Sequence, residues 1–204
     1  MVKRWNQAIQ DRDEQRMLKR QAVLIAGARL FHERGYHQTS LDDIAKSLGV
    51  SKPSLYYYIK NKDEIVYEII ANSLRMTKDE FAKARASKGN GLEKILGFFR
   101  SYALHLHDDF GRCAASVDIL VLGNELQEKI TDARTSIDRE IRLLVAEGQE
   151  DGSVAALDPK LVTFYMFGAF NWIAQWYQTS GPLKPEAVAD AFVAFTRRLL
   201  EFQT

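Results

Sequence analysis

The chain has 204 residues, of which 46% are hydrophobic and 27% carry a charge. This length and apolar content are sufficient for a sizeable buried core in one or two domains. The sequence contains no run of about 18 apolar residues, which argues against a membrane-spanning helix, and its charged N-terminus does not resemble a secretory signal. We therefore expect a cytoplasmic protein with no membrane partner.

The one cysteine, Cys113, limits the covalent and metal chemistry of the chain. It has no second cysteine with which to form an internal disulfide and no Cys/His cluster with which to hold zinc, so we expect neither a metal site nor a cofactor. We expect Cys113 to be a small buried hydrophobic residue, with a redox-sensing thiol as the alternative.

The net charge of +1 conceals an uneven distribution. Residues 1–62 contain 12 Lys and Arg against 6 Asp and Glu, whereas the rest of the chain contains 16 against 21. A basic N-terminal part on an acidic body favours binding of a polyanion at one end, because basic groups release the counterions condensed on nucleic-acid phosphates. Charge alone does not identify that partner.

The hydrophobic patterns have a helical period, and no alternating run of β-branched residues with hairpin turn signals occurs, so we predict an all-α fold. The first ten or so residues lack a sustained apolar period, and we expect a mobile or loosely helical arm there. The first helix should begin near Asp13 and end at Gly35, which suits a left-handed C-terminal stop. Its apolar stripe comprises Val23, Ala26, Gly27, Leu30 and Phe31.

Two short helices should follow. Thr39 or Ser40 offers an N-cap hydroxyl for a helix that ends at Gly49, and Ser51 can cap a third helix over residues 52–59, with Pro53 in its first turn. Two short helices joined by a brief turn that contains glycine are typical of a helix-turn-helix.

The remaining sequence predicts a helical bundle. We expect a long connecting helix over residues 62–87, further helices over 92–108, 124–148, 160–179 and 185–202, and an irregular or short-helical stretch before Gly123. We divide the chain into an N-terminal arm and three-helix head, residues 1–62, and a C-terminal helical domain, residues 63–204.

The third predicted helix carries the functional signal. Leu55 and Ile59 lie one turn apart and can anchor it to the helices beneath, which leaves a surface of Tyr, Ser and Lys side chains. Hydroxyl and ammonium groups can bond phosphate oxygens and base edges in the major groove, and tyrosine rings can contact thymine methyl groups. The alternative is that at least one of Tyr56, Tyr57 and Tyr58 packs in the core.

Four segments, residues 39–45, 49–51, 55–58 and 60–62, resemble in order and spacing the DNA-binding signature of the TetR family of transcription regulators. The resemblance extends over about residues 23–70 and implies that Ser40 and Lys62 bind phosphates at two helix N-termini. It also implies that Tyr58 lies near the DNA backbone. The residues that we expect to contact DNA are Thr39, Ser40, Ser51, Lys52, Pro53, Ser54, Tyr56, Tyr57, Tyr58 and Lys62.

A small head makes few phosphate contacts, so specific binding needs two heads about 34–36 Å apart on a palindromic site. The last two predicted helices carry apolar residues on more sides than one chain can cover. We expect them to form a four-helix dimer interface, as in dimers of the TetR family, with burial inside one chain as the alternative. The stripe on the last helix extends to Phe202, and the expected interface residues are Phe164, Trp176, Phe192, Phe195 and Leu199.

The family resemblance also implies a repressor with a small-molecule effector, which changes the spacing of the two heads and releases DNA. Residues 171–177 and 181–186 resemble the C-terminal part of a TetR subgroup that senses acyl-CoA thioesters. The candidate ligand-binding residues, each of which could instead be a core residue, are Phe99, Tyr102, His105, Tyr165 and Trp172.

An enzyme and a protein-interaction adaptor are the alternative classes. His105 and His107 lie about 200° apart on a helix and cannot ligate one metal together. His105 and Asp109 have a spacing of four, which favours a local hydrogen bond over a catalytic dyad. No GxSxG, HExxH, P-loop or GxGxxG pattern occurs, so we expect no catalytic residues and no enzymatic activity. An adaptor would leave the tyrosine-rich helix unexplained.

Overall fold

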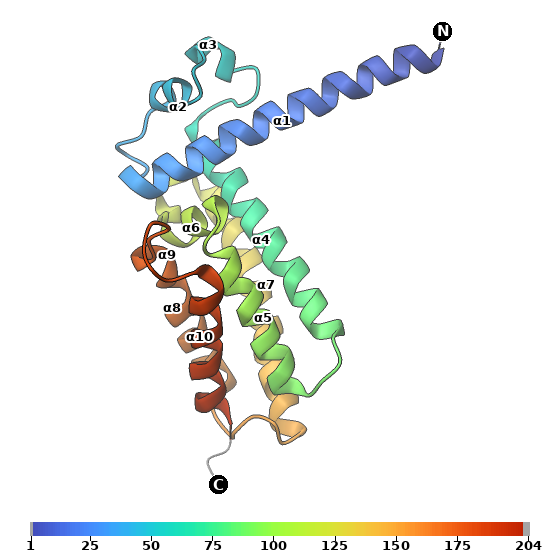
Figure 1. The fold of residues 1–204 in the computed structure, drawn as a ribbon, viewed down its shortest axis with the longest axis vertical. Helices are drawn as coiled ribbons and strands as arrows, with labels where there is room; N and C mark the ends of the chain where they lie inside the picture. Colours follow the sequence, from blue (N-terminus) through green and yellow to red (C-terminus); the bar gives the residue numbers. More distant parts are fainter. Residues whose placement is uncertain (1, 202–204) are drawn as a thin grey trace.

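The computed structural model describes residues 2–201, with side-chain surroundings from residue 13 onward. The described chain contains helices and no strand, which confirms the all-α prediction. Figure 1 shows a head of α1 to α3 lying across one end of an elongated helical body. The elements are α1 (Val2–Arg34), α2 (Leu41–Ser47), α3 (Lys52–Leu55), α4 (Lys62–Ala86), α5 (Gly91–His105), α6 (Asp109–Ser116), the 3-10 turn η1 (Ile119–Val121), α7 (Asn124–Glu150), α8 (Pro159–Asn171), α9 (Ile173–Trp176) and α10 (Pro185–Leu200).

Helix α1 begins at Val2 rather than near Asp13, so the expected arm is the first part of this helix. The segment before Asp13 contains neither glycine nor proline, and its intrinsic propensity permits a helix without an apolar stripe to signal it. The C-terminal end agrees with the prediction, because Gly35 has a φ of 81°, in the left-handed region.

Helix α2 begins where its polar residues predict. The Ser40 hydroxyl accepts a hydrogen bond from the backbone N–H of Asp43, and the Asp43 carboxylate accepts one from the backbone N–H of Ser40. This reciprocal pair satisfies two backbone donors that the first turn of a helix would otherwise leave free.

Helix α3 ends at Leu55, one turn before the expected end at Ile59. The backbone N–H groups of Tyr58 and Ile59 both bond to the carbonyl of Leu55, which tightens the last turn and ends the α-helical pattern. Ser51 precedes the helix without capping its backbone, and its hydroxyl instead bonds that of Ser54 at 2.8 Å. The expected anchors are confirmed, since Leu55 and Ile59 are both buried.

Two apolar clusters support the molecule, and α4 belongs to both. Its first half places Ile65 and Ile69 in the cluster that holds the head, and its second half places Phe81 in the cluster of the body. Cys113 of α6 is buried in the head cluster, as expected, and burial raises the pKa of its thiol to about 12. Helix α4 therefore connects the two parts rigidly.

The C-terminal helices differ from the prediction at one point. The expected helix over residues 160–179 is interrupted at Trp172, so that α8 ends at Asn171 and α9 is a separate short helix. Helix α10 packs against α5 and ends at Leu200, while Phe202 lies outside the described residues. Among the helices described, none combines the length and the apolar character needed to cross a membrane.

Candidate DNA-binding head and effector cavity

The outer surface of the head carries the tyrosines of the third helix. Tyr57 is 76% exposed and Tyr56 53% exposed, and α3 lies on the side of the head that faces away from the body (Figure 1). The Lys52 ammonium bonds the Asp42 carboxylate at 2.7 Å and so fixes α3 to α2. Ser51 and Pro53 are exposed, and Lys52 and Ser54 are partly exposed. This surface is polar and open to a large partner.

Of the three tyrosines, Tyr58 is the one that packs against the core, in agreement with the alternative expectation. It is half-buried against the head cluster, and its carbonyl accepts a hydrogen bond from the Nε of Arg20 at 3.1 Å. Tyr58 therefore helps to hold the segment after α3 against α1.

The side chain of Thr39 is buried inside the head and does not reach the surface that we expect to contact DNA. Its side chain is 1% exposed, and its hydroxyl lies 2.9 Å from the carbonyl oxygen of Gly35 and 3.2 Å from that of Leu30. The hydroxyl satisfies carbonyls at the end of α1, while Ser40 takes the capping position. Because Thr39 and Ser40 both carry a hydroxyl group, the sequence alone does not show which of them caps the helix.

Ser40 and Lys62 lie beside each other, although they are far apart in sequence. The Lys62 Nζ donates hydrogen bonds to the carbonyls of Tyr36 and Thr39, at 2.9 and 3.0 Å, and lies 3.8 Å from the centre of the Tyr36 ring. Burial and a hydrogen bond to Asp63 raise the pKa of Tyr36, so its ring stays neutral beneath the ammonium. A fixed positive charge thus lies next to the N-terminus of α2, where anions are favoured.

Polar contacts tie the head to the body through α1. Arg29 pairs with Asp109 of α6 at 2.9 Å. The Nδ1 of His32 lies 3.0 Å from the Ser116 hydroxyl at the other end of α6. These contacts could not be predicted from sequence, because they join segments about 80 residues apart.

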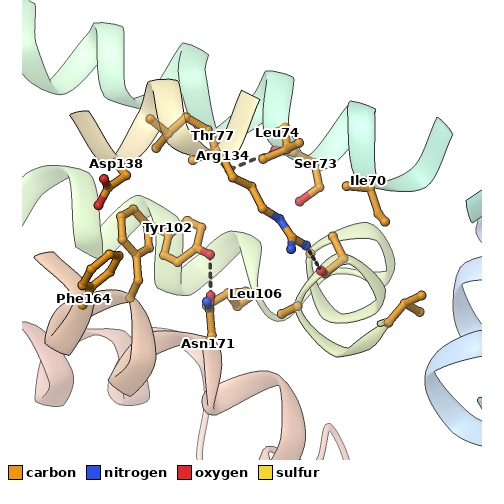
Figure 2. Close-up of a pocket in the computed structure, with 16 residues that line it drawn as sticks. Ile70, Ser73, Leu74, Thr77, Tyr102, Leu106, Arg134, Asp138, Phe164 and Asn171 are labelled. Atoms are coloured by element: carbon orange, nitrogen blue, oxygen red, sulfur yellow. Dashed lines mark hydrogen bonds between the residues drawn. The ribbon is translucent and has the colours of Figure 1, made fainter. Parts of the chain in front are cut away.

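The body contains a cavity of about 310 Å³ enclosed by α4, α5, α6, α7 and α8 (Figure 2). Apolar residues contribute to its wall, including Ile70 of α4, Phe167 of α8 and Leu106, which directly follows α5. A concave space lined by both apolar and polar groups is suited to a small-molecule ligand.

Only one of the five expected ligand-binding residues lines this cavity, namely Tyr102. Phe99 is buried in the aromatic core behind the wall, and His105 lies behind Ser73. Tyr165 and Trp172 point outward, with 61% and 64% of their surfaces exposed. When a helix is apolar on several sides, its hydrophobic period does not show which of those sides faces a cavity.

Polar groups that the sequence did not reveal also face the cavity. The Tyr102 hydroxyl donates to the side-chain oxygen of Asn171 at 2.5 Å, and burial raises the pKa of this tyrosine, which keeps it a neutral donor. Arg134 of α7 reaches the cavity and bonds the carbonyl of Ala114 at 3.2 Å, as Figure 2 shows. Burial lowers the pKa of its guanidinium.

His105 makes a different contact from the one expected. Its Nδ1 lies 2.6 Å from the Asp108 carboxylate, not that of Asp109, because α5 ends at His105 and Asp108 is the N-cap of α6. Its Nε2 lies 2.8 Å from the Ser73 hydroxyl in the cavity wall.

An apolar face covers the outer side of α8, α9 and α10. Of the expected interface residues, Phe195, Leu199 and Trp176 are exposed there, and Phe192 is half-buried beneath them. Phe164 is exposed and also borders the cavity. The exposed large apolar residues of this outer face are Leu161, Phe164, Tyr165, Trp172, Trp176, Phe195 and Leu199.

The described chain has an exposed short helix that follows α2 after a tight turn, a basic head, and a body with a cavity. Together these features define a helix-turn-helix transcription regulator. Residues 23–69 match the model of the bacterial regulatory proteins of the tetR family. Residues 88–200 match the Tetracyclin repressor-like C-terminal domain. The chain therefore belongs to the TetR family of transcription regulators.

Known relatives agree with this family over most of their length. The HTH-type transcriptional repressor KstR2 of Mycolicibacterium smegmatis is 27% identical over 188 residues, which cover 90% of this chain and 91% of the relative. The solved structure of the ketosteroid transcriptional regulator KstR2 of Mycobacterium tuberculosis has a TM-score of 0.84 at 23% identity and covers 91% of this chain and 96% of its own. The structure of AibR in complex with isovaleryl coenzyme A and operator DNA has a TM-score of 0.76 at 22% identity, and it covers 86% of this chain and 96% of its own. The two structural likenesses show the fold.

Proposed function

We propose that this protein is a repressor that binds a palindromic operator as a homodimer and is released by an acyl-CoA thioester. The observation that carries the proposal is that Leu55 of α3 is buried while Tyr56 and Tyr57, which directly follow it, are exposed. A helix that presents exposed aromatic and hydroxyl groups on a basic head suits the major groove.

Within this proposal, two groups of residues divide the work of binding DNA. Ser40 and Lys62 hold phosphates and set the position of the head, because they lie at a helix N-terminus with a fixed ammonium beside it. Tyr58 borders the backbone. The residues facing the groove are Ser51, Lys52, Pro53, Ser54, Tyr56 and Tyr57.

The homodimer rests on the apolar outer face of α8 to α10. Tyr165 and Trp172, which the sequence assigned to a ligand, belong to this face and would be covered by a second copy. Large exposed aromatic residues on successive helices are costly in water and typical of an interface. We propose that residues 1–62 read the operator and that residues 63–204 hold the dimer and the effector, with α4 joining the two.

The acyl-CoA effector is supported by the cavity and by the relatives. The cavity is lined by apolar side chains together with the polar groups of Tyr102, Asn171 and Arg134, which suits an acyl chain with a polar head. The AibR structure contains isovaleryl coenzyme A together with operator DNA. The relatives bear the names of regulators, and we propose a regulator without catalytic function, acting in the cytoplasm where operator DNA lies.

A mobility-shift assay on the DNA flanking the gene of this protein tests the proposal, with and without a panel of acyl-CoAs. We expect a sequence-specific complex that one of the thioesters dissociates. Retention that disappears at high salt and does not depend on sequence would instead show a nonspecific binder. Failure to retain any fragment would favour the enzyme or adaptor class.

A further inference from the structure

A second hollow adjoins the effector cavity on the surface between α4 and α7. It has a volume of about 190 Å³ and is lined by both helices, which pack against each other. Leu74 of α4 lines this groove and the cavity alike, and Ala133 of the groove directly precedes Arg134 of the cavity. The two hollows are therefore neighbours separated by one layer of side chains.

The groove is basic, although the body as a whole is acidic. Arg75 and Lys78 of α4 and Lys129 of α7 line it, and all three are exposed. Lys129 pairs with the exposed Glu125 at 2.6 Å, a contact of the kind that contributes little to stability and that a phosphate can replace. In the described part of the chain, neither Arg75 nor Lys78 forms an ion pair within 4.0 Å, and Arg75 donates to the side-chain oxygen of Asn72.

Arg134 adds a fourth cation at the boundary between cavity and groove. Its guanidinium is partly open to water and partly surrounded by the cavity wall, so it lies near the cavity mouth. Among residues 13–201, no carboxylate lies within ion-pairing distance of the Arg134 guanidinium. The nearby Asp138 pairs with Arg142 instead.

The size of the cavity divides an acyl-CoA into an inner and an outer part. A volume of 310 Å³ is at the lower end of the range of about 300–1,000 Å³ that ligand pockets span, which suffices for an acyl group but not for the nucleotide as well. The phosphates of the nucleotide must then remain outside the cavity, where arginine and lysine bind them well.

We propose that the groove lined by Arg75, Lys78 and Lys129 binds the phosphates of a coenzyme A thioester whose acyl group occupies the cavity, with Arg134 between the two. This inference rests on the proposed effector class and adds the site for its charged end. It assigns to the body a phosphate-binding surface distinct from that of the DNA-binding head.

The test compares thioesters that share an acyl group and differ in whether they carry the phosphorylated adenosine nucleotide of coenzyme A. Butyryl, octanoyl and palmitoyl thioesters of coenzyme A and of pantetheine are titrated against the full chain by calorimetry. We expect the wild type to bind the tightest coenzyme A thioester at least about tenfold more tightly than the matched pantetheine thioester, which lacks the phosphates of the nucleotide. The triple variant Arg75→Gln, Lys78→Gln, Lys129→Gln should lose that difference while keeping its affinity for the pantetheine thioester.

Lys83→Gln is the matched control, because Lys83 lies on the same helix outside the groove and is exposed. It should bind both kinds of thioester as the wild type does. Equal affinity of the wild type for both kinds, or an unchanged preference in the triple variant, would overturn the groove while leaving the effector class in place. Binding of no thioester by the wild type would overturn the effector class and the groove together.

Discussion

The imidazole of His105 on α5 and the hydroxyl of Ser73 on α4 are joined by a hydrogen bond of 2.8 Å. Ser73 faces the cavity, and the other ring nitrogen of His105 lies 2.6 Å from Asp108, the N-cap of α6. The following residue, Asp109, holds Arg29 of the head. A continuous series of polar contacts and one peptide bond therefore extends from the cavity wall to α1.

Ser73→Ala removes a hydroxyl group of the cavity wall. This hydroxyl is the hydrogen-bond partner of the buried Nε2 of His105. We expect the free energy of unfolding to fall by about 1–3 kcal/mol, because the Nε2 of His105 would be left buried without a partner. Urea denaturation measures this change. Ser180→Ala, at an exposed turn, should change stability by no more than about 0.5 kcal/mol. Equal effects of the two substitutions would show that the contact is unimportant.

Tyr57→Ala should affect DNA recognition without affecting the fold. Since Tyr57 is largely exposed, we expect its removal to change stability by less than about 0.5 kcal/mol, whereas Leu55→Ala two residues earlier, at the end of α3, should cost about 2–5 kcal/mol. Binding to a set of operator variants should lose discrimination at one base pair. Uniform weakening across all variants would mean that the tyrosine does not read a base.

Substitution on the apolar outer face should yield monomers. Trp172→Glu places a charge among exposed aromatic residues of α8 to α10, and a second copy would have to bury that charge unpaired. Sedimentation at micromolar concentration should show a dimer for the wild type and a monomer for the variant. Leu120→Glu, at an equally exposed apolar residue in η1, is the control and should remain dimeric. Dimers of both variants would place the interface elsewhere.

Mild acid should weaken the fold through two partly buried histidines. Burial lowers the pKa of His32 and of His107 below the ordinary 6.5, so the folded protein keeps them neutral while the unfolded chain binds protons there. Their contribution is fully present above about pH 6.5 and is lost as the pH falls towards the lower folded values. The double variant His32→Gln, His107→Gln should lose less unfolding free energy than the wild type between about pH 7 and pH 5.5. Parallel pH profiles from urea denaturation would contradict this assignment.

Local chemistry allowed the head to be predicted closely from sequence. The stop at Gly35 and the cap at Ser40 depend on residues within a few positions, and both are found where they were expected. The burial of Leu55 and Ile59 follows from helical spacing in the same way. The start of α1 was missed because a polar helix has no apolar period.

The cavity could not be predicted in the same way, because its wall is assembled from five helices. Tyr165 and Trp172 lie on an apolar helix that has a cavity on one side and a bare face on the other, and periodicity does not distinguish the two. Arg134 has no motif around it, and the sequence shows no phosphate-binding loop for coenzyme A. The basic groove joins residues of α4 and α7 that are about 50 positions apart, so only the fold reveals it.

The central claim is that two copies of the outward-facing α3 enter successive major grooves of one operator. Hydroxyl-radical footprinting of the operator tests this claim most directly. We expect two protected segments on one face of the duplex, centred about 34–36 Å apart or a multiple of this distance, and their loss when the effector is added. A single protected segment, or protection that follows no fixed spacing, would contradict the account.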